Sequence, residues 1–496
     1  MFEDLATGLH LVLTIDSIFS IVGGVAIGIV VGALPGMSGT MGVALALPFT
    51  FYMQPVSAIL LLLGLYKGAI YGGSISAILI NTPGMASSAC TVLDGYPMAR
   101  AGKAGKALKM ALYASCIADF ISNLALILLT GLIAGFALRF GPPEFFSLIC
   151  FSLTIIAGVS GASVIRGLVS AGFGLILATI GIDIIYGTER FIFGNVTLMG
   201  GLGFIPVLIG LFAIPEILNQ LRYPSNRRQL MGGVSKSGVS LREMRDSLVT
   251  ILRGSVIGVV LGAVPGIGPA PAAFLSYSEA RRSSRNPEQY GKGELNGIAA
   301  SESGNNGAAG ATMIPLLSLG VPGDVVTAVI LGAFMVHGLS PGPIMFQDNI
   351  HMIYALYIGI LISSVCILLI ALMAIRVFAR VADLPNGIVF PTVLVLCVYG
   401  CYAVNNSMTD LLVMMIMGIV GFGMLRFDIP AAPFLIAFVL GPLFEDNFRR
   451  SILLGRGEID VFFRSEITWV FYALTAITLW VLFRRILRDN ATQKKI

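Results

Sequence analysis

Two Pro-Gly breaks inside long apolar runs carry the residues best suited to bind a ligand. The first reads Gly32-Ala-Leu-Pro-Gly36, and the second, 230 positions later, reads Gly262-Ala-Val-Pro-Gly266. In a membrane such a break frees backbone N–H and C=O groups that protein, water or a ligand must satisfy. The helix that follows each break would aim N–H groups inward, where a carboxylate can bind. We therefore expect substrate contacts from Pro35, Gly36, Ser38, Gly39, Thr40, Pro265, Gly266 and Gly268.

A second pair of breaks offers oxygen atoms instead. Asn81-Thr-Pro-Gly84 and Ser318-Leu-Gly-Val-Pro-Gly323 combine hydroxyl, amide and unwound carbonyl oxygens, which suit Na⁺ in broken-helix carriers. Glycine and proline also occur in membrane helices for packing and kinks, so one such break alone favours a structural role. Four breaks in symmetric positions favour a transport site. Cation contacts are expected from Asn81, Thr82, Pro83, Gly84, Ser318, Gly320, Val321, Pro322 and Gly323, and substrate contacts also from Ser87 and Ser88.

The most polar cluster within an apolar segment is Ser301-Glu-Ser-Gly-Asn-Asn306. Glu302 fits a proton carrier, an ion ligand or a structural carboxylate bonded to backbone N–H groups, and the sequence does not choose among them. Asn305 and Asn306 are better candidates for ligand contact, because neutral amides need no desolvated charge.

Lys67 and Asp119 are charged residues in apolar runs, and such residues are functional candidates by default. Asn123 follows Asp119 by one helical turn on the same face. A substrate role, an ion pair with Asp119 and snorkelling of Lys67 all stay open. Asp183, Glu189 and Arg190 follow an apolar run, and a capped, solvated loop is the favoured interpretation there.

Composition sets the class of protein. Of the 496 residues, 56% are hydrophobic and 11% are charged, whereas a soluble domain averages about 25% charged residues. The chain is therefore predicted to cross a membrane many times. The net charge of +5 belongs to loops and gives no sign of nucleic acid, and the six cysteines fit small core residues. The acidic N-terminus lacks the basic region of a cleavable signal peptide.

Landmarks recur in the same order in both halves, which indicates an internal duplication. Pro83 and Pro322 lie 239 positions apart, and Ile205–Glu216 resembles Pro433–Glu445. Lys and Arg residues of short loops stay cytoplasmic, and their distribution swaps between the halves: 100–109 is basic where 337–351 is not, and 281–292 is basic where 51–55 is not. An inverted-topology repeat predicts this swap.

The expected fold is an all-α polytopic membrane protein with two inverted-topology repeats, two re-entrant Pro-Gly hairpins and about 11 net crossings. The first repeat covers 1–221, a cytoplasmic linker with the start of the second repeat covers 222–253, the second repeat covers 254–447, and a final helix with a basic tail covers 448–496. The N-terminus is expected outside and the C-terminus inside, although Arg449, Arg450 and Arg456 fit this topology least well. The expected crossings are 57–98, 107–137, 142–160, 164–185, 200–221, 293–337, 350–378, 386–403, 408–424, 430–447 and 467–483.

Signatures of enzymes are missing from the sequence. The three histidines are scattered, and no H-E-x-x-H, Cys–His cluster, G-x-S-x-G elbow or Walker A sequence occurs. We expect no enzyme activity, no cofactor and no metal other than Na⁺. A passive anion channel, an intramembrane enzyme and a lipid flippase are the less favoured alternatives.

Several of these motifs together resemble the large permease subunit of the tripartite tricarboxylate transporters over essentially the whole chain. The resemblance rests on Gly32–Gly39, Tyr71–Gly84, Glu302–Asn306, Ile314–Gly323 and His337–Pro343. It implies a bacterial inner-membrane permease that works with a small four-helix membrane subunit and a periplasmic binding protein. It also implies uptake of a carboxylate driven by Na⁺ or H⁺, which places the N-terminus in the periplasm and the C-terminus in the cytoplasm. Lys67 and Asp119 match no motif of that family.

These observations predict a secondary-active permease for a tricarboxylate such as citrate, or a related dicarboxylate or aromatic carboxylate. Alternating access around a midplane site fits an inverted repeat, and hairpins converging from both sides suggest an elevator-like motion. A stand-alone carrier remains an alternative to the tripartite system.

Overall fold

The protein is an all-α polytopic membrane protein. The computed structural model describes residues 2–159, 163–183, 185–222, 237–381 and 384–493. Residues 223–236 of the expected linker, and Lys494 and Lys495 of the basic tail, lie outside these ranges. In the described part, eight helices are long and apolar enough to cross a membrane. The chain divides into two compact units: residues 1–134 with 216–404, and residues 135–215 with 405–496.

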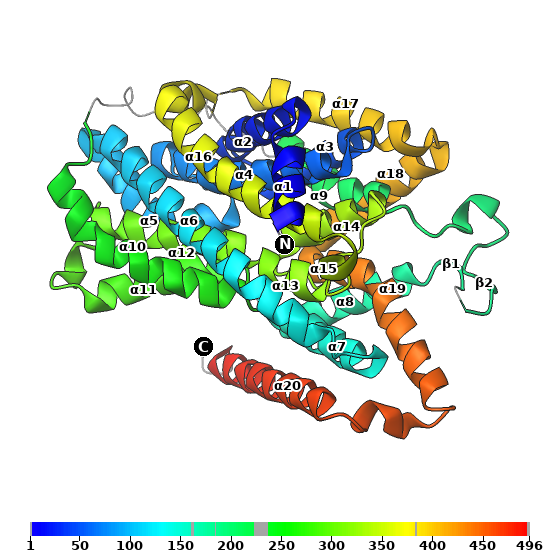
Figure 1. The fold of residues 1–496 in the computed structure, drawn as a ribbon. Coiled ribbons are helices and arrows are strands. Elements are labelled where there is room, and N and C mark those ends of the chain that lie inside the picture. Colours follow the sequence, from blue (N-terminus) through cyan, green and yellow to red (C-terminus); the bar gives the residue numbers. More distant parts are fainter. Residues whose placement is uncertain (1, 160–162, 184, 223–236, 382–383, 494–496) are drawn as a thin grey trace. The chain divides into compact units, whose positions relative to one another are not determined.

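Unit 1 takes one segment from each expected repeat. It contains the Pro-Gly breaks Gly32–Gly36 and Gly262–Gly266, the further breaks Asn81–Gly84 and Ser318–Gly323, and the helices around them (Figure 1). Its elements are α1 (Phe2–Val12), α2 (Ile15–Ala33), α3 (Gly39–Thr50), α4 (Pro55–Ile80), η1 (Ala86–Ser88), α5 (Ala89–Met98), η2 (Ala99–Lys103), α6 (Ala104–Ala137, up to 134), the end of α9 (Phe204–Arg222), α10 (Leu241–Gly262), α11 (Pro269–Ser283), η4 (Pro287–Gln289), α12 (Leu295–Ala311), α13 (Met313–Leu319), α14 (Val325–Val336), α15 (Met345–Asp348), α16 (Ile350–Val381) and α17 (Asn386–Asn405, up to 404).

Glycines let two helix pairs of unit 1 approach closely, as small residues do in membrane bundles. Gly24, Gly28 and Gly32 of α2 lie against backbone carbonyls of α4, so that a Cβ at Gly28 would stand 2.2 Å from the Leu65 oxygen. In the second half, Gly258 and Gly262 of α10 lie against the backbone of α12 in the same way. Figure 1 shows α2 beside α4 and α10 beside α12. The 230-residue offset thus relates two similar packings as well as two similar sequences.

The two longest expected crossings, 57–98 and 293–337, are each divided into helices with a fold-back between them. After α4, the chain returns until Ser88 lies against Gly73, and then α5 runs beside the end of α4. After α13, the chain returns until Gly323 lies against Thr312, and α14 follows. Each half therefore contains a fold-back between two of its helices.

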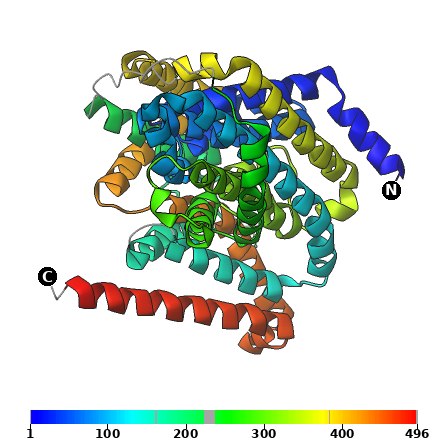
Figure 2. The same cartoon turned by 90° about the vertical axis from the view of Figure 1, so that its left-hand side faces the viewer.

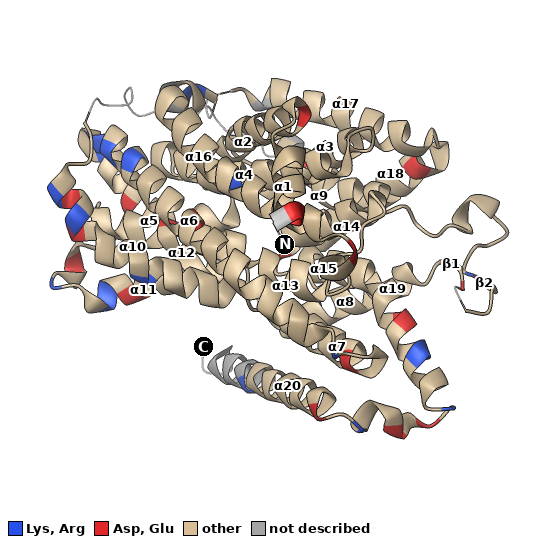
Figure 3. Cartoon of the chain, viewed as in Figure 1, with Lys and Arg blue, Asp and Glu red and all other residues tan. Residues whose placement is uncertain are grey.

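In unit 1, the loops rich in Lys and Arg lie at one set of helix ends, and the loops without Lys or Arg lie at the opposite ends. Lys106 forms an ion pair with Glu243 at the start of α10, and Gly293 lies against Met98. The basic segment after α5, the start of α10 and the basic segment after α11 thus lie together, as Figure 3 shows for the charges around α10 and α11. At the other ends of the helices, His337 contacts Thr50 at 3.4 Å, so the two loops without Lys or Arg also meet. The two hairpins consequently open in opposite directions within unit 1, as an inverted repeat predicts.

Unit 2 consists of shorter helices and one small ribbon. Close glycine contacts join α7 to α8, α8 to α19 and α9 to α18, and α20 runs along α7 (Figure 2). Its elements are α7 (Pro142–Val159), α8 (Val164–Ala178), β1 (Gly181–Ile182), β2 (Glu189–Arg190), η3 (Val196–Leu198), the first part of α9 (up to 215), α18 (Met408–Arg426), α19 (Ala431–Leu454), η5 (Ile459–Phe463) and α20 (Glu466–Gln493). β1 and β2 are antiparallel, with Gly181 opposite Arg190.

Two details of unit 2 differ from the sequence prediction. The crossing expected over 164–185 ends at Ala178, because Gly181 takes a positive φ of 125° and the chain turns into β1. The solvated loop expected at Asp183 is wrong, since Asp183 is only 3% exposed. Its carboxylate contacts Arg449 at 2.7 Å and Arg190 at 3.5 Å, and both arginines also pair with Glu445. Arg449, which did not fit the expected membrane topology, therefore belongs to an ion-pair network at the end of α19.

Candidate functional site: the buried polar centre of unit 1

Each Pro-Gly break contacts the further break of its own half. A Cβ at Gly84 would stand 1.8 Å from the carbonyl oxygen of Gly32, so only glycine fits there without movement. In the second half, the N–H of Gly266 donates to the carbonyl oxygen of Gly323 at 2.8 Å. The four segments expected to bind ligands thus form two matched pairs.

The residue after each further break packs on the start of the hairpin's second helix. Met85 lies against Gly39 at the start of α3, and Asp324 lies against Gly268 at the start of α11. Asp324 caps α14 by accepting the N–H of Thr327 at 2.7 Å, and it also accepts the hydroxyl of Tyr66 from α4 at 2.7 Å. The second break is therefore tied to the first half of the chain by a buried side-chain bond.

The two hairpin helices differ in what they offer an anion. At α3, the Ser38 hydroxyl caps Met41, and no hydrogen bond of the described residues uses the N–H of Gly39 or Thr40. At α11, Pro269 and Pro271 have no N–H, and Gly268 provides no side-chain cap. Because backbone N–H groups carry anion binding at a helix start, α3 is the better carboxylate site.

Four buried polar side chains beside this region have atoms without a hydrogen-bond partner. They are the hydroxyls of Tyr71, Ser87 and Ser88 and both amide atoms of Asn305. All four residues are at most 4% exposed. An unsatisfied buried polar group costs about 1–3 kcal/mol, so such a group is expected to serve a ligand or water.

These unpartnered groups come from elements that pack together. On α12, Gly297 faces Asp94 and Ser301 contacts Thr91, which both belong to α5. Asn305 lies one turn further along the same face, and η1 with Ser87 and Ser88 precedes α5 and also packs on α12. The helical register therefore places Asn305 opposite the two serines.

Glu302 lies on the adjacent face of α12, fully buried. Its carboxylate contacts the Thr91 hydroxyl, accepts the Ser115 hydroxyl at 3.0 Å and accepts the Asn306 amide at 3.3 Å. All three partners are neutral side chains. The alternative of a carboxylate bonded to backbone N–H groups does not apply.

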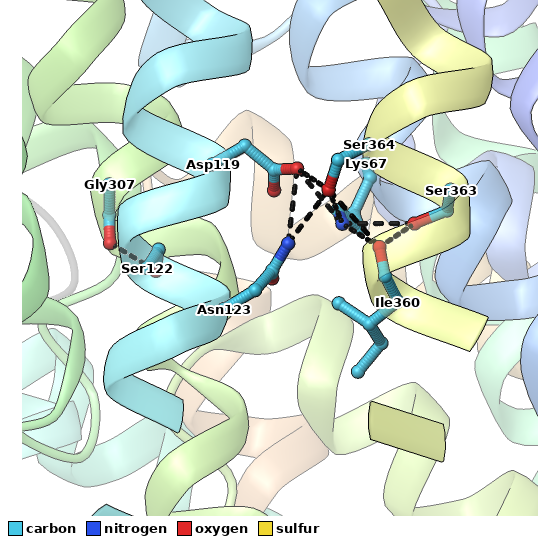
Figure 4. Close-up of polar contacts among 8 residues, drawn as sticks. All are labelled: Lys67, Asp119, Ser122, Asn123, Gly307, Ile360, Ser363 and Ser364. Atoms are coloured by element: carbon cyan, nitrogen blue, oxygen red, sulfur yellow. Dashed lines mark hydrogen bonds and ion pairs between the residues drawn. The ribbon is translucent and has the colours of Figure 1, made fainter. Parts of the chain in front are cut away.

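Lys67 and Asp119 form a buried ion pair, which excludes snorkelling of the lysine. Their charged atoms are 2.9 Å apart, and each side chain is 4% exposed. The Lys67 ammonium also donates to the Ile360 carbonyl and the Ser363 hydroxyl of α16, both at 2.9 Å. Figure 4 shows the pair held between α4, α6 and α16, with Asn123 and Ser364 bonded to Asp119.

Comparison with known proteins assigns the chain to a family. The sequence model of the tripartite tricarboxylate transporter TctA family matches residues 18–436. The chain belongs to the TctA family. A relative from Agrobacterium vitis, an uncharacterized 52.8 kDa protein in the TAR-I ttuC′ 3′ region, is 37% identical over 467 residues, covering 94% of this chain and 93% of that protein. A second, an uncharacterized protein in the TAR-II ttuC′ 3′ region of the same organism, is 35% identical over 210 residues, covering 42% of this chain and 87% of that protein. No solved structure matches the chain.

Family membership makes the chain a multi-pass membrane subunit of a tripartite tricarboxylate transporter, a system that includes other subunits. Within this TctA-family subunit, every residue expected at the site lies in unit 1. The residues expected to bind substrate lie at three places: around the start of α3, around Asn305, and at the break before α11, where Gly266 and Gly268 contact Gly323 and Asp324.

The residues expected to bind the cation are not equivalent in the two halves. Ser318 and Gly320–Gly323 are buried, whereas Asn81 is exposed and Thr82 and Pro83 are partly exposed. Asn81 ends α4 with a left-handed φ of 56°. In the second half Gly320 takes the matching role at the end of α13, with a φ of 72°.

Sequence reasoning missed several partners in this TctA-family site. Thr91, Ser115, Ser363 and Ser364 hold the buried charges, yet hydroxyls in helices carry no distinctive spacing. Two of the missed residues, the carboxylates Asp94 and Asp324, could have been found from their sequence context. Asp94 is isolated among apolar residues and accepts the N–H groups of Gly291, Gly293 and Glu294. Asp324 directly follows a Pro-Gly pair and precedes Thr327 by three positions, which is the spacing of a helix cap.

Proposed function

We propose that the chain is the permease subunit of a cation-gradient-driven uptake system for carboxylates, with alternating access of a site carried by unit 1. The observation that carries this proposal is the group of buried, unpartnered donors at Ser87, Ser88 and Asn305. Such donors bind a carboxylate without burying a permanent positive charge. The free N–H groups of Gly39 and Thr40 add the positive end of a helix.

The charge balance of the site supports a co-transported cation. A buried anion needs compensation, and the buried Lys67 is already paired with Asp119. The substrate's charge would therefore be balanced by helix ends, neutral donors and a bound cation, Na⁺ or H⁺. The buried carbonyls of Gly320–Gly323 stay a candidate for Na⁺, and no other metal and no cofactor is proposed.

The proposed partners are a small membrane subunit and a periplasmic solute-binding protein that delivers the carboxylate. We place the permease in the bacterial inner membrane, with the joined basic loops of unit 1 in the cytoplasm, because Lys and Arg of short loops stay on that side. A periplasmic N-terminus and a cytoplasmic C-terminus are part of the same proposal.

Reconstitution tests this function. Proteoliposomes with this chain and its small membrane partner are supplied with labelled citrate, succinate or phthalate, with and without binding protein, under a Na⁺ or a pH gradient. Gradient-driven uptake of at least one of these carboxylates is expected. Absence of uptake for all three with every component present would overturn the proposal.

A further inference from the structure

Four carboxylates are buried among the described residues of unit 1, and three of them are fully compensated. Asp119 pairs with Lys67. Asp94 accepts three backbone N–H groups and the Tyr277 hydroxyl. Asp324 caps a helix and accepts the Tyr66 hydroxyl. Each arrangement stabilises the ionised form by a cation or by backbone N–H groups.

Glu302 is different, because it has neither kind of compensation. Its partners are two hydroxyls and one amide, and no Lys, Arg or His in the described ranges forms an ion pair with it. A buried carboxylate held only by neutral groups retains a large desolvation cost when it is ionised. Protonation would remove that cost.

The titratable groups around Glu302 do not supply a positive charge. Tyr71 of α4 and Cys90 of α5 interact electrostatically with Glu302, and Cys116 of α6 follows its partner Ser115; all three are neutral when protonated. Two further helices, α10 and α11, pack against α12. The Tyr277 hydroxyl of α11 donates a hydrogen bond to Asp94, and Arg253 of α10 is exposed. Among the described residues of these elements, Asp94 and Asp119 are further buried acids, and each is compensated; the one buried cation, Lys67 of α4, is held by Asp119.

We propose that Glu302 binds and releases the proton that drives this permease. A proton from one side of the membrane joins a carboxylate oxygen to give the neutral acid, and the same proton leaves toward the other side. The neutral acid needs an acceptor. Thr91 can serve, because its oxygen contacts Glu302 and lies 3.1 Å from the Ser301 hydroxyl, to which Thr91 can turn its own hydrogen.

The surroundings favour a proton over Na⁺ at this position. The Asn306 amide directs its hydrogens at the Ser115 oxygen at 2.8 Å and at both the carbonyl and the carboxylate of Glu302. A metal cation bound by the oxygens of Glu302, Thr91 and Ser115 would also meet the N–H groups of Asn306, which repel it. A proton needs only one acceptor.

The position of Glu302 also explains how proton and substrate would be coupled, a step that rests on the proposed function. Asn305, a proposed substrate contact, follows Glu302 by three positions, so the two side chains are about 5–6 Å apart on one helix. A carboxylate bound beyond Asn305 would lie further away, and with an effective dielectric constant of about 20 an ionised Glu302 would weaken its binding about tenfold or more. By linkage, the carboxylate would strengthen proton binding by the same factor.

Infrared spectroscopy tests the proton site without any transport assay. The full chain in lipid is titrated from pH 5 to pH 9, and the carbonyl stretch of a protonated carboxyl group is followed in wild type and in Glu302→Gln. We expect a titrating band that disappears in the variant. If the variant does not fold, Glu302→Asp should shift the band. A wild-type spectrum without a titrating band, or a band unaffected by either substitution, overturns the proposal.

Transport then tests coupling. With citrate or succinate as probe, wild type should accumulate substrate under a pH gradient, whereas Glu302→Gln should exchange substrate but lose accumulation. Glu288→Gln, in the exposed loop after α11, is the matched control and should behave as wild type. Accumulation driven by Na⁺ alone, or by the pH gradient in Glu302→Gln, contradicts the proposal. Failure of wild type to move either probe contradicts the proposed function for those substrates, while the infrared titration still decides the role of Glu302.

Discussion

Lys67 of α4 and Asp119 of α6 are joined at 2.9 Å in the interior of unit 1, where each side chain is 4% exposed. The serines of α16 complete the shell of the lysine. Three helices from both halves of the chain are therefore joined through one charge pair. Removing one partner of such a buried pair is costly, because the other charge then stays in the protein interior with neither a counter-charge nor water to stabilise it.

Replacing one partner of this pair should destabilise the protein strongly. Lys67→Met or Asp119→Asn alone is expected to cost about 3–5 kcal/mol, and the double variant should cost clearly less than the sum. Unfolding of the purified protein in detergent, followed by heat or denaturant, measures the coupling. Additive effects would show that the two charges do not depend on each other.

The contact between Gly84 and Gly32 predicts a steric effect. Gly84→Ala places a Cβ 1.8 Å from the Gly32 oxygen, so the break must shift and carboxylate uptake should fall at least about tenfold, which corresponds to about 1.4 kcal/mol. Gly131→Ala in α6 is the control, because a Cβ there meets nothing within 4 Å. It should keep activity, since alanine is the better helix former. Equal effects of the two substitutions would contradict the close packing.

The unpartnered donors predict an effect on affinity. Ser88→Ala and Asn305→Ala should each raise the KM for the carboxylate about tenfold or more, because a hydrogen bond to a charged group contributes about 1.5–3 kcal/mol. Ser255→Ala serves as control, since its buried hydroxyl bonds only the Ile251 carbonyl within its own helix. The comparison is made by initial uptake rates over a range of substrate concentrations. An unchanged KM in both site variants would remove these residues from the binding site.

The ion-pair network of unit 2 predicts a dependence on pH. The pKa of Asp183 is lowered by the N–H groups of Tyr186 and Ile185 and by the guanidinium groups of Arg449 and Arg190. A lowered pKa in the folded state gives stability that is fully present above the ordinary value of 3.8 and is lost as the pH falls through the folded value.

Asp183→Asn should therefore lower the melting temperature by a constant amount between pH 5 and pH 8, and by less below about pH 4. Asp428→Asn, which breaks an exposed pair with Arg166, should change little at any pH. A difference for Asp183→Asn that grows as the pH falls would reverse the assigned sign.

The sequence predicted the breaks and their correspondence between the two halves, because Pro-Gly at matched offsets has few structural meanings in a membrane helix. Glu302, Asn305 and Asn306 stood out because polar side chains are costly in apolar segments. What the sequence lacked were tertiary partners. Ser115 and Ser363 lie in different helices from the charges they bind, and nothing in the spacing of α6 or α16 reveals which helical face meets Glu302 or Lys67. The network of Asp183 was missed for the same reason, since Arg449 and Glu445 follow more than 250 positions later.

The most direct test of the account is the ratio of internal to external labelled citrate, or of succinate or phthalate, in proteoliposomes held at zero membrane potential under an imposed pH gradient. We predict a ratio well above one that collapses when the gradient is dissipated. Rapid flux that never raises the ratio above one would identify a passive channel and contradict the central claim.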